Sequence, residues 1–216
     1  MAHHSSTPTL LQHVCGGNAE WLDTVSFLVV FGFSHAFGIE KRGRMPYRLR
    51  MKSKPYSIRN AGFHDVSGIY KLIKGNPNEL VPRSMNDISQ NTDRFLIAEV
   101  AEKLAGIVSW SILPEIGKAE HPSVEIKSLC VSKDARGLGL GKALVQAAIK
   151  RIRTMQPEDI IVLTFTPDFF AKLGFKAVPK ETMMHKLYTG CLNCSKYDSP
   201  FTCPEVAMIM DLRKHG

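Results

Sequence analysis

The strongest constraint on this chain lies between Ser123 and Gln146, where an apolar strand, a glycine-rich turn and the start of an amphipathic helix follow one another. The turn, residues 136–142, reads RGLGLGK. Glycines at alternate positions let the backbone approach a charged ligand closely. A helix N-terminus directly after them adds unpaired N–H donors and partial positive charge, while Arg136 and Lys142 supply full charge. The stretch therefore predicts a binding site for phosphate groups.

The glycine spacing excludes two common phosphate loops. Gly139 and Gly141 are separated by one residue, whereas the dinucleotide-binding turn needs two there. Ala143 stands where a Walker loop has a hydroxyl, and Arg136 stands where it has its first glycine. The remaining pattern resembles the R-G-x-G-x-G/A pyrophosphate loop of the GCN5-related N-acetyltransferases (GNAT), which follows a long strand and holds acetyl-CoA. The alternative is a tight strand-to-helix connection with no ligand.

The formal charge of +8 and the pI of about 9.3 fit a polyanionic cofactor as well as a nucleic acid. Residues 1–55 carry seven Lys or Arg against three acidic residues, so half of the excess lies there. A nucleic-acid binder that uses the basic residues 41–54 is therefore one alternative. The rest of the chain has no basic motif rich in aromatic residues, so we expect no nucleic-acid partner.

Cysteine usage indicates a reducing compartment. The five cysteines are an odd number, and Cys130 lies inside an apolar strand, which does not fit a disulfide framework. We therefore expect a cytoplasmic protein. The apolar run 25–38 is too short to span a bilayer, and basic residues follow it rather than precede it, so we expect neither a membrane span nor a signal peptide.

Two domains of unequal character are expected. Residues 1–55 predict a disordered or loosely structured extension, translated from a start codon upstream of the true one, with Met45 and Met51 as alternative starts. Residues 56–216 predict one catalytic domain with a cysteine-containing C-terminal segment. Apolar periodicity and turn residues place strands and helices along it. Strands are expected at 57–60, 94–100, 104–113, 124–131, 160–165, 175–178 and 206–212, and helices at 63–74, 84–90, 140–154 and 167–173.

This order predicts an α+β domain. A second motif, residues 169–175 (FFAKLGF), resembles the F-[YF]-x-K-x-G-F segment of the GNAT family, which lies beside the cofactor. Both motifs together cover roughly residues 56–180. The resemblance implies the GNAT fold, with a mixed, mostly antiparallel central sheet flanked by helices, and acetyl-CoA as co-substrate.

The resemblance also implies which residues hold acetyl-CoA. The family presents backbone N–H groups of the central strand to the thioester and the pantetheine, a role that falls to Leu129 and Val131. Side chains that only fill the core are the alternative there. The expected cofactor contacts are Leu129, Cys130, Val131, Arg136, Gly137, Leu138, Gly139, Leu140, Gly141, Lys142 and Phe170.

Glu125 is the candidate general base for the attacking amine. It shares a strand face with Lys127, whereas Val124, Ile126 and Ser128 are expected to point the other way. A carboxylate there can accept the amine proton directly or through a water molecule. The alternative is a solvated pair of Glu125 and Lys127 of little energetic value.

The acid that protonates the leaving thiolate is harder to place. The wider family uses a tyrosine where this chain has Phe169 and Phe170, which carry no hydroxyl. Thr164, Thr166 or solvent must then serve, and Thr164 is the candidate. Cys130 is expected to face the core, so we expect direct attack in a ternary complex without an acetylated cysteine.

Four further segments, LVPRS, EIKSL, TFTPDFF and HKLYxxCLxC, resemble the short N-acetylglutamate synthases. That resemblance implies acetylation of the α-amine of glutamate, or of glutamine, at the first step of arginine biosynthesis. It also implies that Arg83, Lys127 and Lys186 bind substrate carboxylates. The alternatives are another small amine, a protein N-terminus, or a non-catalytic acyl-CoA-binding protein. A homodimer is compatible with each of them.

Cys191, Cys194 and Cys203, with His185 nearby, have some of the spacing of a zinc site. A second Cys-x2-Cys unit is missing, so free thiols that steady the last strand are the preferred interpretation. No metal is expected to take part in catalysis.

Overall fold

The computed structural model describes residues 55–113, 122–192, 194 and 196–213. All described residues belong to one compact unit within Met51–Gly216. The expectations for residues 1–54 and for the loop at 114–121 therefore lie outside the described part of the chain.

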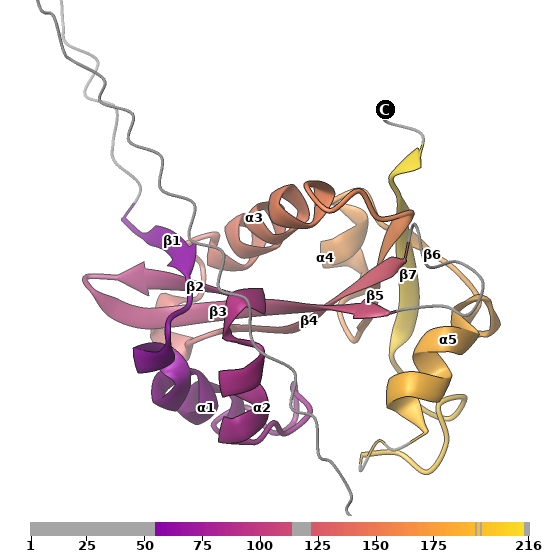
Figure 1. Ribbon diagram of the computed structural model, residues 1–216, viewed down its shortest axis with the longest axis horizontal. Helices are drawn as coiled ribbons and strands as arrows, with labels where there is room; N and C mark the ends of the chain where they lie inside the picture. The colour runs from indigo at the N-terminus through magenta and orange to yellow at the C-terminus, as the bar shows by residue number, and fades with distance from the viewer. Residues whose placement is uncertain (1–54, 114–121, 193, 195, 214–216) are drawn as a thin grey trace, which may run out of the picture. The chain divides into compact units, whose positions relative to one another are not determined.

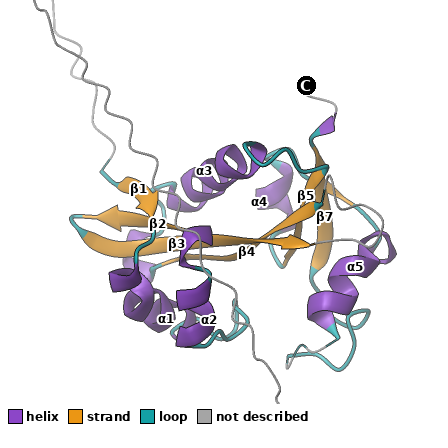
Figure 2. Cartoon of the chain, viewed as in Figure 1, coloured by secondary structure: helices purple, strands orange, loops and turns teal. Residues whose placement is uncertain are grey.

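A seven-stranded sheet forms the centre of the described unit (Figures 1 and 2). The only parallel pair among these strands is β4 with β5, and the other neighbours are antiparallel. This confirms the predicted α+β class with a mixed, mostly antiparallel sheet. In spatial order the strands are β1 (Ser57–Asn60), β2 (Phe95–Val100), β3 (Lys103–Leu113), β4 (Ser123–Val131), β5 (Asp159–Thr164), β7 (Val206–Asp211) and β6 (Lys176–Ala177).

Helices cover both faces of the sheet (Figure 1). On one face lie α3 (Leu140–Arg153) and α4 (Pro167–Ala171), whose apolar side chains join the largest core cluster. On the other face α1 (Val66–Lys74) and α2 (Met85–Gln90) cover a second cluster. The predicted cap of α2 is confirmed, because the Asp87 N–H donates to Ser84 Oγ at 3.1 Å.

The segment after β6 was not predicted as helical. Residues Lys180–Met183 form a 3-10 turn, α5 spans Met184–Lys186, and Leu187–Cys191 close a π-helical turn. Met183 and Leu187 lie four residues apart and are 1% and 2% exposed, so they anchor the segment against the sheet. Other boundaries differ by a few residues: a 3-10 turn, Phe63–Asp65, precedes α1, and β6 has only two residues.

Strand β4 contains a bulge that changes the direction of its side chains. Ser109 faces Lys127 and Ile107 faces Cys130, so Val108 alone spans two residues of β4. Before the bulge, Val124 and Ile126 belong to the largest core cluster, which lies under α3 and which we call the α3 cluster. After the bulge, Leu129 and Val131 pack against that same cluster. The strict alternation expected from the sequence is therefore broken.

The expected direction of Ser128 was wrong for this reason. Its φ angle of 54° places it in the left-handed region, where strand alternation no longer applies. Its Oγ lies 3.5 Å from the guanidinium of Arg83, on the face that carries Lys127.

Strands β4 and β5 separate soon after they begin. Their parallel pairing is recorded only for Val124 with Ile160 and for Glu125 with Ile161. From Ile126 onward, the β5-facing edge of β4 has no ladder partner among the described strands. Unpaired N–H and C=O groups on such an edge are available to an extended ligand.

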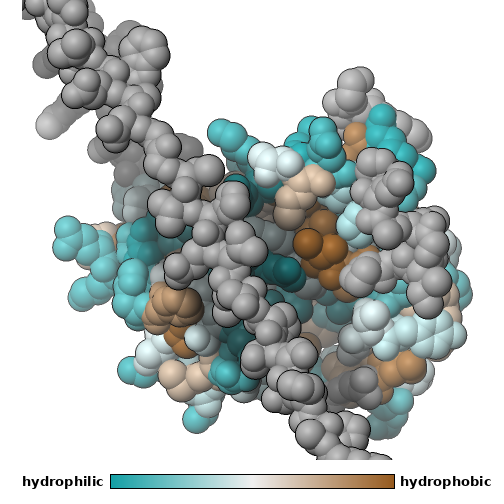
Figure 3. Space-filling view, viewed as in Figure 1, coloured by the Kyte–Doolittle hydropathy of each residue, from teal (hydrophilic) through white to brown (hydrophobic). Residues whose placement is uncertain are grey.

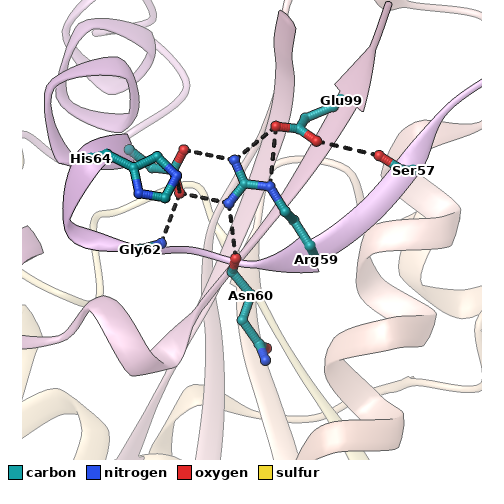
Figure 4. Close-up of polar contacts among 7 residues, drawn as sticks. Ser57, Arg59, Asn60, Gly62, His64 and Glu99 are labelled. Atoms are coloured by element: carbon teal, nitrogen blue, oxygen red, sulfur yellow. Dashed lines mark hydrogen bonds and ion pairs between the residues drawn. The ribbon is translucent and has the colours of Figure 1, made fainter. Parts of the chain in front are cut away.

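Arg59 ties β1 to its neighbours (Figure 4). Its guanidinium donates to Asp65 at 2.7 and 2.9 Å and to Glu99 at 2.7 and 3.1 Å. Asp65 also accepts the Gly62 N–H at 2.7 Å. The hydrogen bonds from Arg59 are the main cause that lowers the pKa of Asp65.

Hydrophilic residues cover most of the described surface that Figure 3 shows, and hydrophobic residues form small separate groups there. Among the described residues, no helix combines the length and the apolar character needed to cross a bilayer.

Replacing Arg59 by methionine should lower the free energy of unfolding at neutral pH by about 1–2 kcal/mol, a modest value because Arg59 is partly exposed. The folded-state pKa of Asp65 lies below its usual value of 3.8, so its stabilisation is present above that value and is lost as the pH falls through the folded pKa. Urea unfolding of both proteins from neutral pH down to about pH 3 should therefore show a smaller acid dependence for the variant. Parallel curves would contradict this assignment.

Candidate active site

The glycine turn leaves its backbone open. Gly137 and Gly139 have φ angles of 85° and 77°, a region that favours glycine. A Cβ built on either residue meets no heavy atom within 4 Å. Gly139 is also the N-cap of α3 and supplies no side-chain cap, so the first N–H groups of the helix stay available. These features fit the pyrophosphate of acetyl-CoA.

Of the charged residues at the turn, Lys142 is exposed, and Arg136 forms an ion pair with Glu79 at 3.1 Å on the surface. Leu138 is 42% exposed, whereas Leu140 is 1% exposed and belongs to the core. Leu140 can therefore reach a cofactor only through its backbone.

Phe170 was expected beside the cofactor, but its side chain is 2% exposed and packs in the α3 cluster, edge-to-face with Phe175. Phe169 is the ring beside the glycine turn, since a Cβ on Gly141 would lie 3.7 Å from it. The sequence motif located the segment correctly, but the packing of α4 selects which ring faces the turn.

The thioester contacts are predicted on the β4 backbone after the bulge. Leu129 and Val131 are half-buried, and their strand edge toward β5 is open. Cys130 is 2% exposed and belongs to the cluster under α1 and α2. Burial raises the pKa of its thiol to about 11, so this thiol stays protonated at neutral pH.

Glu125 is buried, with 5% of its surface exposed. Its Oε1 lies 2.7 Å from the Lys186 ammonium, and its Oε2 accepts a hydrogen bond from Ser111 Oγ at 3.3 Å. The alternative of a solvated pair on the strand is therefore wrong. The ion pair joins β4 to α5, two segments far apart in the sequence.

Two lysines lie near this carboxylate, and Arg83 lies near one of them, Lys127. Burial lowers the pKa of Lys127, Glu125 raises it, and the nearby charges of Arg83 and Lys186 lower it further. The four charged residues that the sequence predicted at the acceptor side are thus linked electrostatically through Lys127. The Arg83 side chain is 9% exposed and forms an ion pair with Asp87 at 2.5 Å.

Thr164 ends β5 and is 7% exposed. Its Oγ1 accepts the Thr166 N–H at 3.0 Å and lies 3.2 Å from the Thr166 hydroxyl. The hydroxyl is therefore held within its own turn, and its role in protonating a thiolate stays a prediction.

The three C-terminal cysteines line one hollow, together with Leu187 and Glu205. Burial is the largest cause that raises the pKa of Cys191, Cys203 and Glu205, and the charges of Glu125 and Lys186 also act on Cys191 and Glu205. Within the described ranges, no three His, Cys, Asp or Glu side chains are arranged to hold a metal ion.

Sequence reasoning missed Ser109, Ser111 and Gly190. The two serines alternate in an otherwise apolar strand, IVSWSIL, and that pattern could have marked the face that carries Glu125. Gly190 had no sequence signal. A Cβ there would lie 2.7 Å from the Lys186 ammonium, so glycine leaves room for the ion pair.

Comparison with known proteins identifies the class. Residues 65–175 match the Acetyltransferase (GNAT) family. The match spans half of the chain, and the order of strands, glycine turn and helix described above agrees with it. The chain therefore belongs to the GNAT acetyltransferase family, which makes it an acetyl-CoA-dependent N-acetyltransferase.

Individual relatives differ in acceptor. An uncharacterized N-acetyltransferase from Chlorobaculum tepidum is 29% identical over 72% of this chain and 96% of the relative. An N-alpha-acetyltransferase from Sulfurisphaera tokodaii is 28% identical over 62% and 88%, respectively. An amino-acid acetyltransferase from Mycobacterium tuberculosis is 24% identical over 65% and 79%.

Solved structures share the fold. The N-acetylglutamate synthase of Neisseria gonorrhoeae, complexed with coenzyme A and N-acetyl-glutamate, is similar with a TM-score of 0.59 at 23% identity. The similarity covers 73% of this chain but only 35% of that one. A Mycobacterium tuberculosis protein complexed with CoA has a TM-score of 0.60 at 21% identity, over 72% of this chain and 99% of that one.

Replacing Gly139 by alanine should weaken coenzyme A binding roughly tenfold, because a side chain at this positive φ angle costs about 1 kcal/mol or more in the turn that meets the phosphates. Isothermal titration calorimetry with coenzyme A measures the effect. Gly75→Ala is the matched control, since Gly75 has an ordinary helical φ angle of −72° and ends α1. Equal losses in both variants would contradict the prediction.

Proposed function

We propose that this enzyme transfers the acetyl group of acetyl-CoA to the α-amine of an amino acid, with L-glutamate as the acceptor. One observation carries the proposal: the buried carboxylate Glu125 pairs with Lys186 and lies within electrostatic reach of Lys127, which Arg83 also approaches. A zwitterionic, dicarboxylic acceptor complements such a site, because its ammonium pairs with the carboxylate and its carboxylates pair with the cations.

Bound acetyl-CoA supplies the activated acetyl thioester. The open glycine turn and the N-terminus of α3 bind its phosphates, and the unpaired edge of β4 at Leu129 and Val131 binds its thioester end. Holding both substrates in one geometry provides a large part of the rate enhancement.

Glu125 receives the proton of the attacking ammonium. In the structure the Lys186 ammonium lies 2.7 Å from Glu125 Oε1. The acceptor ammonium therefore partly replaces Lys186 as the partner of this carboxylate. Ser111 holds the second oxygen and fixes the carboxylate's orientation. Lys127 then binds an acceptor carboxylate, together with Lys186 and the donors of Arg83 that the protein does not use.

The state of the Cys130 thiol favours direct attack of the amine on the thioester. The pKa of about 11 keeps Cys130 protonated, and its side chain lies in the core. An acetylated cysteine is therefore not part of the proposed mechanism. Thr164 or water protonates the departing thiolate.

An α-amine at a protein N-terminus is the second candidate acceptor. It is favoured by the 28% identity with the N-alpha-acetyltransferase of Sulfurisphaera tokodaii. A peptide has no free carboxylate beside its α-amine, so it leaves the charges of Lys127 and Arg83 unmatched unless its side chains are acidic.

Release of free coenzyme A, measured with each of the twenty amino acids and with short peptides, should be fastest with L-glutamate, because only dicarboxylic acceptors match the three cations. Glutamine is the informative control, since it keeps the size of glutamate and removes one charge. Faster release with an uncharged peptide would support N-terminal acetylation and contradict the glutamate proposal.

Replacing Glu125 by glutamine should lower kcat roughly a hundredfold or more, because general bases contribute about that much. The Kd for acetyl-CoA should change little. Glu99→Gln is the control, since Glu99 lies in the Arg59 network on β2. Thermal melting checks the fold, because Lys186 loses its buried partner. Equal losses in kcat and in acetyl-CoA affinity would give Glu125 a structural role instead.

A further inference from the structure

Arg83 is held by the protein on several sides. Its Nε donates to Asp87 at 2.5 Å, and one terminal nitrogen donates to Ser109 Oγ at 3.1 Å. Its guanidinium lies 4.9 Å from the centre of the Phe95 ring, and only 9% of the side chain is exposed. An arginine that served only to grip an incoming carboxylate would keep a fork of donors free. Two of its three nitrogens, Nε and one terminal nitrogen, already have protein partners.

Ser109 passes the contact on to strand β4. It is 1% exposed, in the middle of β3, and its Oγ donates to the Lys127 carbonyl at 3.2 Å. A hydroxyl can accept one hydrogen bond while it donates another. Asp87, Arg83, Ser109 and the Lys127 carbonyl therefore form one continuous chain of polar contacts, which runs from the partly exposed Asp87 to the buried Ser109 and which we call the Arg83 relay.

The relay ends where the bulge begins. Lys127 pairs with Ser109 and is the last paired residue of β4 before the register shifts. Ser128 follows it with a φ angle of 54°. A left-handed conformation is unfavourable for an L-residue, so it persists only where surrounding contacts hold it. Arg83 also approaches Ser128 Oγ at 3.5 Å, the outer limit of a hydrogen bond.

The bulge decides how the next residues are presented. It reverses the side-chain alternation, so Leu129 and Val131 pack toward α3. The same backbone rotation fixes where their N–H groups point along the open edge of β4. A contact that holds Lys127 and Ser128 in place thereby holds these N–H groups as well.

We propose that Arg83 is a positioning residue that acts through Ser109 to hold the β4 bulge, and thereby aims the Leu129 and Val131 N–H groups at the thioester. The inference rests on the proposed function only in that these N–H groups bind acetyl-CoA. It links α2, on the acceptor side, to the cofactor side of the same strand. A merely substrate-binding Arg83 would leave the thioester contact unchanged.

Amide hydrogen exchange in the full chain tests the relay without any acceptor. Acetyl-CoA should slow exchange across Leu129–Val131 in the wild-type protein. In Arg83→Ala and in Ser109→Ala this protection should fall roughly tenfold, because each variant breaks a hydrogen-bonded chain that includes a charged donor. Arg83→Lys should reduce the protection similarly, since an ammonium lacks the planar set of donors with which a guanidinium reaches Asp87 and Ser109 at once.

Adding Ser128→Gly to Arg83→Ala gives the decisive comparison. Glycine adopts the left-handed conformation without the relay, so the double variant should regain most of the protection. Ser57→Ala, which removes a hydroxyl from β1, should leave it unchanged. A purely structural contribution of Arg83 would lower the melting temperature but would not be rescued at residue 128.

Unchanged protection in Arg83→Ala, or a loss that Ser128→Gly does not restore, overturns the proposal. Absence of any protection by acetyl-CoA in the wild-type protein overturns it too. Failure of the proposed function has a different result, in which no amino acid releases coenzyme A while the protection pattern of the variants stays as expected. With an active acceptor, Arg83→Ala should lower kcat roughly tenfold and Ser128→Gly should restore it.

Discussion

The site depends on one departure from regular pairing, the separation of β4 from β5 after Glu125. Backbone N–H and C=O groups normally satisfy one another across a sheet, and an unpaired stretch in its interior is costly unless a ligand or water replaces the lost partner. At the end of this open stretch, the Val131 side chain lies close to Gly141, at the end of the glycine turn. The same strand therefore carries the proposed catalytic carboxylate where it is paired and the proposed cofactor contacts where it is not.

A group of charged residues lies near this opening. Glu125 and Lys186 form a buried ion pair, and Lys127 lies within electrostatic reach of both residues and of Arg83. Buried ion pairs add little net stability, because desolvation offsets their attraction. Their presence is better explained by the substrate that the proposed function assigns to them than by folding.

Helix α5 and the π-helical turn after it complete the acceptor side. Lys186 reaches Glu125 from α5, and Gly190 leaves space for its ammonium. π-helical turns occur often at functional sites, because the extra residue redirects nearby side chains. The C-terminal segment thus contributes to the site although it lies about sixty residues after β4 in the sequence.

The sequence determined the order of the elements, the glycine turn, the cap at Ser84 and the charged residues of the acceptor side, because periodicity, capping and glycine spacing are local properties. It could not determine that Phe169 rather than Phe170 faces the turn, since the packing of α4 on the core selects the ring. Only the tertiary structure decided the direction of Ser128, the helix at Lys180–Cys191 and the partners of Arg83. A bulge, an ion pair and a hydrogen-bond relay each join residues far apart in the chain, and no local pattern encodes such contacts.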